Sequence, residues 1–176
     1  EEEKEMWRIA QDFLYSGFLI NSLNFDKSNF QLFNALEKHN KGFFINYLIM
    51  KKSLSEITEE FNKEKICFVV LKGMALNIEK IFLPGIRQHR DIDLLVEKED
   101  IGKAYKILRK LKFKYCNPET SDNADFLIEH QLPPMRNDFG IILELHHRIT
   151  KVDLFKKCPL TDSFFKKKKE SKLMKG

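Results

Sequence analysis

The spacing of apolar residues separates a helical beginning of the chain from a mixed remainder. Over residues 5–25 and 28–62, aromatic and leucine side chains recur every three to four positions, which is the spacing of a buried helix face. Asn40-Lys41-Gly42 interrupts the second stretch, and we expect a break between two helices there. We interpret the aromatic residues on these faces as core packing.

Beyond residue 63 the pattern changes to short apolar runs that predict strands. Three of them are clear and cover residues 66–71, 91–96 and 141–149. Because side chains alternate along a strand, Asp91 and Asp93 should share one face, while their apolar neighbours enter a core. In the third run the same alternation places Glu144 on one face with Ile142 and His146.

Helices and shorter strands are expected between and beside these runs. Residues 74–82 predict a helix after the first strand, and residues 99–111 predict an amphipathic helix after the second. Short strands are expected at 113–116 and 126–132, the latter broken by Pro133-Pro134. This order of elements predicts an α+β fold, in which helices pack on a mixed β-sheet and a helical segment precedes it.

A chain of 176 residues is long enough for one domain with a real core. We divide it into an N-terminal helical segment, a mixed core and a basic tail, with bounds 1–62, 63–160 and 161–176. The tail contains Lys166 to Lys169, which we interpret as a solvated helix end or chain terminus. Because the first residue is Glu1 rather than Met, we expect a fragment or a trimmed chain.

Charge and cysteine content narrow the functional class only slightly. The formal charge of +5 and the pI of about 9.0 suit an anionic partner such as a nucleotide or nucleic acid, although lysine-rich faces more often serve solubility. Cys67, Cys116 and Cys158 have neither disulfide nor metal-ligand spacing. No apolar run reaches the roughly 18 residues that span a bilayer. We therefore expect a cytoplasmic protein that does not enter a membrane.

The acidic residues of the second and third strands are the strongest chemical signal. Asp91 and Asp93 would repel each other on one strand face, and a divalent cation offsets that repulsion. Magnesium prefers carboxylate oxygen ligands. If the two strands are neighbours, Glu144 joins the pair, and three carboxylates can hold one or two magnesium ions for an in-line phosphoryl displacement. The third carboxylate could also help to deprotonate an acceptor hydroxyl.

Basic and glycine residues near these strands could bind a phosphate chain. Gly73 allows close approach of the backbone to a phosphate, and Lys72 could neutralise one as a point charge. Arg87 and Arg90 could reach a triphosphate in forked geometry. Two alternatives stay open: Lys72 could extend from a strand end into solvent, and the arginines could be structural partners of the carboxylates. We interpret His146 as a hydrogen-bonded structural histidine.

The ordered motifs resemble a known family. Leu71-Lys72-Gly73-Met74-Ala75-Leu76, the segment from Arg87 to Val96 containing Asp-Ile-Asp-Leu-Leu-Val, and Glu144-Leu145-His146 are similar to a nucleotidyltransferase family of the DNA polymerase beta-like superfamily. The match is to its bacterial group with the pattern "LKG…R…DIDLLV…ELH". The segment His130-Gln131-Leu132-Pro133-Pro134 is similar to a further part of this pattern. The resemblance covers roughly residues 60 to 150.

The resemblance implies a nucleotidyltransferase fold that uses a metal-bound nucleoside triphosphate, such as ATP, as donor. Asp91, Asp93 and Glu144 would be the catalytic metal carboxylates, with Mg²⁺ as cofactor and Mn²⁺ as an alternative. For the nucleotide we assign a set of five residues: Lys72, Gly73, Met74, Arg87 and Arg90. The wider superfamily usually has Gly-Gly or Gly-Ser at the turn, whereas Met74 follows Gly73 here, so a serine hydroxyl is missing.

Two functional hypotheses follow. The first is a magnesium-dependent nucleotidyltransferase that moves a nucleoside monophosphate onto an acceptor by two-metal in-line displacement, with release of pyrophosphate. The acceptor could be a small molecule, a protein side chain or an RNA end. The second is a catalytically silent nucleotide- or RNA-binding module, as in a toxin–antitoxin or regulatory component; the basic tail and the Gly73-Met74 pair favour it. The sequence does not choose the acceptor, the base or the oligomeric state.

Overall fold

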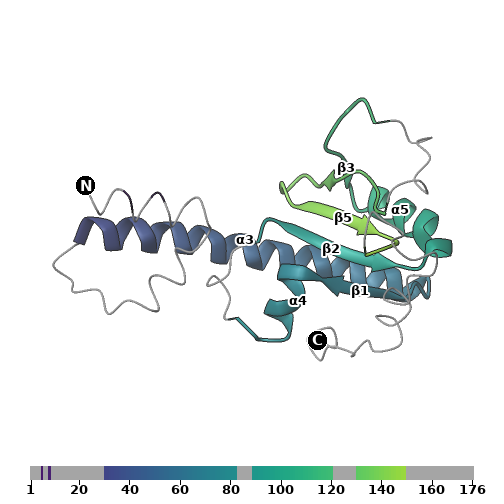
Figure 1. Cartoon of the computed structure of the whole chain (residues 1–176). Coiled ribbons are helices and arrows are strands. Elements are labelled where there is room, and N and C mark those ends of the chain that lie inside the picture. Colours follow the sequence, from purple (N-terminus) through teal and green to yellow (C-terminus); the bar gives the residue numbers. More distant parts are fainter. Residues whose placement is uncertain (1–4, 6–7, 9–29, 83–88, 121–129, 150–176) are drawn as a thin grey trace.

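The computed structural model describes residues 5, 8, 30–82, 89–120 and 130–149 (Figure 1). These residues form three α-helices, one 3₁₀ turn and five strands. In chain order the elements are α3 (Phe30–Lys63), β1 (Phe68–Leu71), α4 (Lys72–Ile78), β2 (Asp91–Val96), the 3₁₀ turn (Lys98–Asp100), α5 (Ile101–Lys110), β3 (Lys114–Tyr115), β4 (Met135–Arg136) and β5 (Ile142–His146).

The strands form one mixed sheet in the order β1-β2-β5-β4-β3. β2 lies between β1, which runs antiparallel to it, and β5, which runs parallel to it. β4 pairs antiparallel with both β5 and β3 and so extends the sheet on the far side. Helices flank the sheet, which confirms the predicted α+β architecture. None of the described helices carries an apolar stretch of the kind that crossing a bilayer requires.

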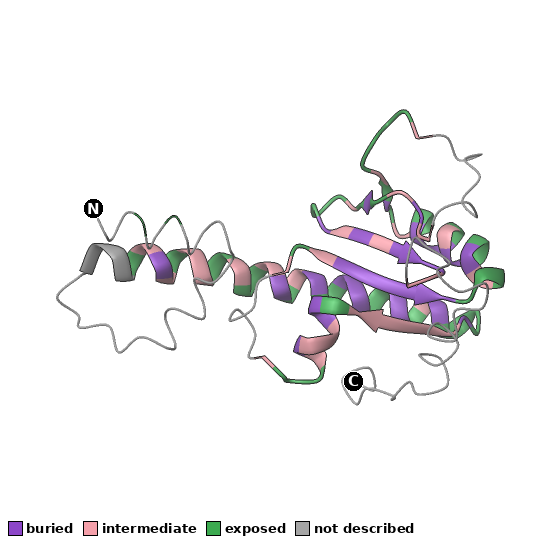
Figure 2. Cartoon of the chain, in the orientation of Figure 1, coloured by how far each residue is buried: buried purple, intermediate pink, exposed green. Residues whose placement is uncertain are grey.

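One face of the sheet packs against the hydrophobic core. Alternate residues of β2 and β5 belong to it, as the alternation of the sequence predicted: Ile92, Leu94, Val96, Leu143 and Leu145. The second half of α3 joins this core through one stripe with helical spacing: Met50, Leu54, Ile57 and Phe61. α5 contributes four more buried residues: Ile101, Ala104, Ile107 and Leu108. Figure 2 shows this buried layer along the sheet and the neighbouring helices.

α3 is continuous, so the expected break at Asn40-Lys41-Gly42 is wrong. The buried positions on both sides of Gly42 keep one helical phase, because Leu36, Tyr47 and Met50 are all buried. A glycine within a helix costs only about 1 kcal/mol relative to alanine, and Gly42 is exposed with open space around it. The buried stripe therefore outweighs the local preference for a break.

Other boundaries differ modestly from the predictions. α4 begins at Lys72 and ends at Ile78, earlier than the helix expected over 74–82. β4 was not predicted, because a two-residue strand after a proline pair gives no periodic signal. Of the strand expected over 126–132, residues 126–129 lie outside the described residues, and Gln131 forms an isolated bridge with His146. The helix expected over 5–25 also lies outside them, except for Glu5 and Arg8, which are helical.

Candidate active site

The parallel pairing of β2 with β5 brings two carboxylates together. Asp93 is the register partner of Glu144, and paired residues of neighbouring strands point to the same face. The side chain of Asp93 is 1% exposed, whereas that of Glu144 is 21% exposed. The sheet therefore presents one buried and one accessible carboxylate side by side, on the face opposite the hydrophobic core.

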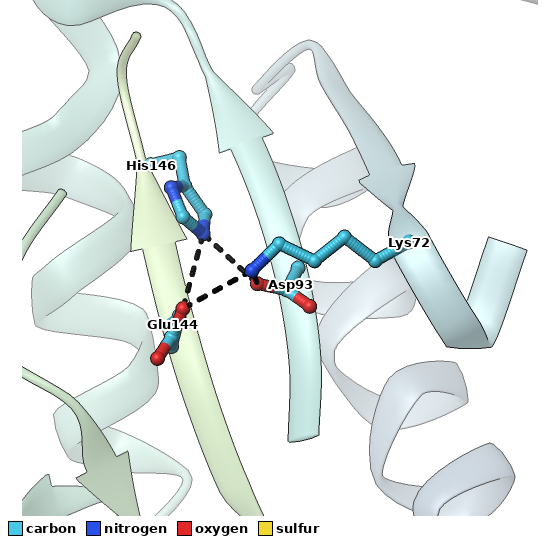
Figure 3. A network of polar contacts seen from close by, with 4 residues as sticks. All are labelled: Lys72, Asp93, Glu144 and His146. Atoms are coloured by element: carbon cyan, nitrogen blue, oxygen red, sulfur yellow. Dashed lines mark hydrogen bonds and ion pairs between the residues drawn. The ribbon is translucent and has the colours of Figure 1, made fainter. Parts of the chain in front are cut away.

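Lys72 reaches this pair from the neighbouring strand. β1 runs antiparallel to β2 with Leu71 opposite Asp93, so Lys72 follows directly at the strand end. Its Nζ lies 2.5 Å from Oδ1 of Asp93 and 3.5 Å from Oε2 of Glu144 (Figure 3). Lys72 has a φ of 49°, in the left-handed region, where the chain turns from β1 into α4. This turn directs the lysine side chain across β2 rather than along the strand.

His146 contacts the same two carboxylates from β5. Its Nε2 lies 3.0 Å from Oδ1 of Asp93 and 3.5 Å from Oε2 of Glu144. An ionised carboxylate only accepts hydrogen bonds, so in this arrangement Nε2 of His146 donates to Asp93. Figure 3 shows the resulting network, in which the ammonium and the imidazole both converge on one pair of oxygen atoms.

The contacts within the network favour the charged forms of Asp93 and Lys72. Burial alone would raise the pKa of Asp93, but the hydrogen bonds from His146 and Lys72 and the lysine charge outweigh it, so the pKa lies below its ordinary value. Burial would lower the pKa of Lys72, whereas the hydrogen bond and charge of Asp93 and the charges of Glu144 and Asp91 raise it above its ordinary value. At neutral pH the pair is therefore an ion pair.

The donor set fits a divalent cation. Asp93, Glu144 and His146 each offer one ligand atom, and these atoms lie within 4.8 Å of one another. Oδ2 of Asp93 is buried and has no hydrogen-bond partner within the described part of the chain. Carboxylate oxygens suit Mg²⁺ and Mn²⁺, and an imidazole nitrogen suits transition-metal ions such as Mn²⁺. Positive charge is already stabilised here, because the Lys72 ammonium lies between the carboxylates.

α4 is fixed by close contact with the segment that precedes β2. Gly73 is buried, and a Cβ at this position would lie 2.6 Å from Cβ of His89. Asn77, also buried, has its Nδ2 3.3 Å from Nδ1 of His89 and donates to it. Close packing against His89 therefore explains why residue 73 is glycine, independently of any contact with phosphate. It also fixes the start of α4, from which Lys72 extends.

The remaining predicted residues are placed less centrally. Asp91 shares the face of Asp93 on β2, but its register partner is Ile142, and it does not belong to the three-residue donor group. The side chain of Met74 is fully buried in the core, so only its backbone could face a ligand. Arg90 is exposed just before β2, and Arg87 lies outside the described residues.

The predicted hydrogen bond of His146 is confirmed, and the structure adds a second contact. The imidazole therefore contacts both carboxylates rather than one. The available signal was the Glu144-Leu145-His146 triplet, since residues two apart on a strand share a face. The contact with Asp93 depended on the pairing of β2 with β5, which the triplet alone does not reveal.

A family model described as "uncharacterised nucleotidyltransferase" matches residues 4–175. A search of curated proteins and a search of solved structures each gave no significant match. The match spans nearly the whole chain, including every segment that carries the carboxylates, the lysine and the histidine described above.

Proposed function

The chain belongs to the uncharacterised nucleotidyltransferase family, and on this premise we propose that it transfers a nucleoside monophosphate from a nucleoside triphosphate to an acceptor hydroxyl. The acceptor oxygen forms a bond to the α-phosphorus, the bond from this phosphorus to the bridging oxygen breaks, and pyrophosphate leaves. Magnesium or manganese is the cofactor of this proposal. ATP is a candidate donor, and the acceptor is a small molecule, a protein or an RNA end.

One observation carries the proposal. Asp93 lies on β2 and Glu144 on β5, and α5, β3 and β4 come between these strands in the sequence. The two carboxylates nevertheless meet on one face of the sheet, where both contact the positively charged Lys72 ammonium. Two adjacent carboxylates without such a charge would repel each other. Phosphoryl transfer depends on cations held in this way, because most of the catalytic work is positioning and neutralisation of charge.

We assign the roles by exposure and position. Asp93 and Glu144, with Asp91 on the same face of β2, hold the cation, and His146 completes the set or orients Asp93. A divalent cation held there would neutralise the triphosphate and align the attacking and leaving oxygens. Glu144 is the more accessible carboxylate, so it is the group placed to accept the proton of the acceptor hydroxyl.

The basic residues act on the phosphate chain. Lys72 is 55% exposed and can pair with a phosphate as a compact point charge. Arg90 is exposed beside the first residue of β2, within the same region as Asp91. With Arg87, it would supply forked hydrogen bonds to the β- and γ-phosphates. The backbone of Gly73 and Met74 completes the proposed donor-binding turn.

Transfer of label from α-³²P nucleoside triphosphates tests the proposal. Each of the four triphosphates is incubated with magnesium, the protein and fractionated acceptors, namely small molecules, proteins and RNA. We expect labelled product with the unsubstituted chain and its loss in Asp93→Asn. Asp100→Asn is the matched control, because Asp100 also pairs with a lysine, Lys103, at 3.5 Å but lies in the 3₁₀ turn before α5 and does not belong to the donor group of Asp93. Labelling that persists in Asp93→Asn would refute the proposal.

A specific observation also favours the second candidate, a binding module without turnover. The Lys72 ammonium already offsets the negative charge of Asp93 and Glu144. The two carboxylates could therefore lie side by side without a metal ion. Titration calorimetry with each triphosphate, with and without magnesium, separates the two candidate functions. Magnesium-dependent binding with pyrophosphate release supports transfer. RNA binding that weakens with salt and does not respond to magnesium supports the binding module.

A further inference from the structure

Lys72 already contacts one oxygen of each of the two carboxylates that would hold a metal. Its Nζ contacts Oδ1 of Asp93 and Oε2 of Glu144, and Nε2 of His146 contacts these same two atoms. The three candidate donor atoms therefore surround a position that the ammonium has partly taken. A divalent cation bound to these same two oxygens would lie close to the ammonium, where the like charges repel each other.

We propose that Lys72 is the resident counter-ion of the site: metal binding displaces its ammonium from Asp93 and Glu144, and the released ammonium then pairs with the triphosphate. The inference rests on the proposed function and adds an order of events to it. The same lysine first stabilises the empty carboxylate pair and then recognises the donor, so metal and nucleotide binding are coupled through one side chain.

The structure identifies Lys72 as the partner that moves. Asp93 is 1% exposed and fixed in the middle of β2, whereas the Lys72 side chain is 55% exposed on a flexible four-carbon stem. The backbone at Lys72 is held by the left-handed turn and by the close packing of Gly73 against His89. The ammonium can therefore leave by rotation of the side chain alone, with no movement of the sheet or of α4.

The inference predicts effects of opposite sign on two ligands. A neutral residue at position 72 removes the ammonium that competes with the metal, so Mn²⁺ should bind about tenfold more tightly. This factor is of the order expected when metal binding no longer has to break a partly exposed ion pair. The same variant loses a phosphate partner, so inorganic triphosphate should bind about tenfold more weakly at saturating Mn²⁺. A lysine with a merely structural role would weaken both.

Calorimetric titration of the full chain, first with Mn²⁺ alone and then with inorganic triphosphate at saturating Mn²⁺, tests this. Lys72→Met and Lys72→Gly are the neutral variants, and glycine adopts positive φ without strain, so it guards against a folding defect. Lys72→Arg keeps the charge and should bind Mn²⁺ as the unsubstituted chain does. Lys112→Met is the matched control, since Lys112 is exposed and also left-handed, with a φ of 66°.

The outcomes separate this inference from the proposed function. Tighter Mn²⁺ binding and weaker triphosphate binding in both neutral variants, with Lys112→Met unchanged, support displacement. A different result would overturn the role of Lys72 but keep the metal site: Asp93→Asn abolishes Mn²⁺ binding, while both neutral variants bind Mn²⁺ no more tightly than the unsubstituted chain. If the unsubstituted chain binds no Mn²⁺ or Mg²⁺, alone or with triphosphate, the metal-dependent function and this inference fall together.

Discussion

Gly73→Ala tests whether close packing or phosphate contact explains the glycine at the start of α4. The added Cβ would lie 2.6 Å from Cβ of His89 and 3.0 Å from its Cγ. Carbon atoms pack at about 3.5–4.0 Å, and a Cβ cannot move without its backbone. α4 must therefore shift from the segment before β2. Overpacking of this kind costs about 1–3 kcal/mol, while alanine in a helix gains about 1 kcal/mol, so we expect a net loss of up to about 2 kcal/mol.

Urea unfolding followed by circular dichroism measures this loss, and two other glycines provide controls of opposite sign. Gly42 in α3 and Gly102 in α5 are exposed, and a Cβ at either position meets nothing within 4 Å. Alanine there should stabilise the protein by up to about 1 kcal/mol through helix propensity. If Gly73→Ala is as stable as these variants and only nucleotide binding is lost, the packing explanation is wrong and the phosphate contact explains the residue.

Two further predictions concern the network itself. The pKa of Asp93 is lower in the folded chain than its ordinary value of 3.8, so the unfolded chain binds more protons at acid pH. The stability of the protein should therefore fall as the pH drops through about 4, and Asp93→Asn should flatten this part of a profile of urea midpoint against pH. An equally steep profile in that variant would exclude Asp93 as the cause. His146→Gln keeps a donor for Asp93 but removes the imidazole, so Mn²⁺ affinity should fall about tenfold while Mg²⁺ affinity changes less; equal retention of both ions would leave His146 a purely positioning role.

The sequence was informative where one strand or helix contains the whole signal. The alternation of Asp91 to Val96 placed the carboxylates and the core residues on their correct faces, and the order of apolar runs gave the α+β class. The continuity of α3 through Gly42 was not foreseen, because local helix breakers are weak compared with a buried stripe that keeps its phase over the whole helix.

Contacts between strands could not be obtained from the sequence in the same way. The ion pair of Lys72 with Asp93 depends on Leu71 lying opposite Asp93 in the antiparallel β1–β2 pair. The approach of His146 to Asp93 depends on the parallel β2–β5 register. The packing of Gly73 on His89 requires the segment just before β2 to lie against the start of α4. Each is a tertiary contact that depends on how the strands pair and on the register of that pairing, which the sheet as a whole determines.

A double-mutant cycle of Mn²⁺ affinity, measured by calorimetry on Asp93→Asn, Glu144→Gln and the double variant, tests the central claim that these two carboxylates bind one cation. If they do, each single substitution should weaken binding at least about tenfold, and the double variant should be little worse than either, because removal of one ligand already disrupts the site. Asp100→Asn should bind as the unsubstituted chain does. Full affinity in Glu144→Gln, or losses that simply add, would contradict the claim.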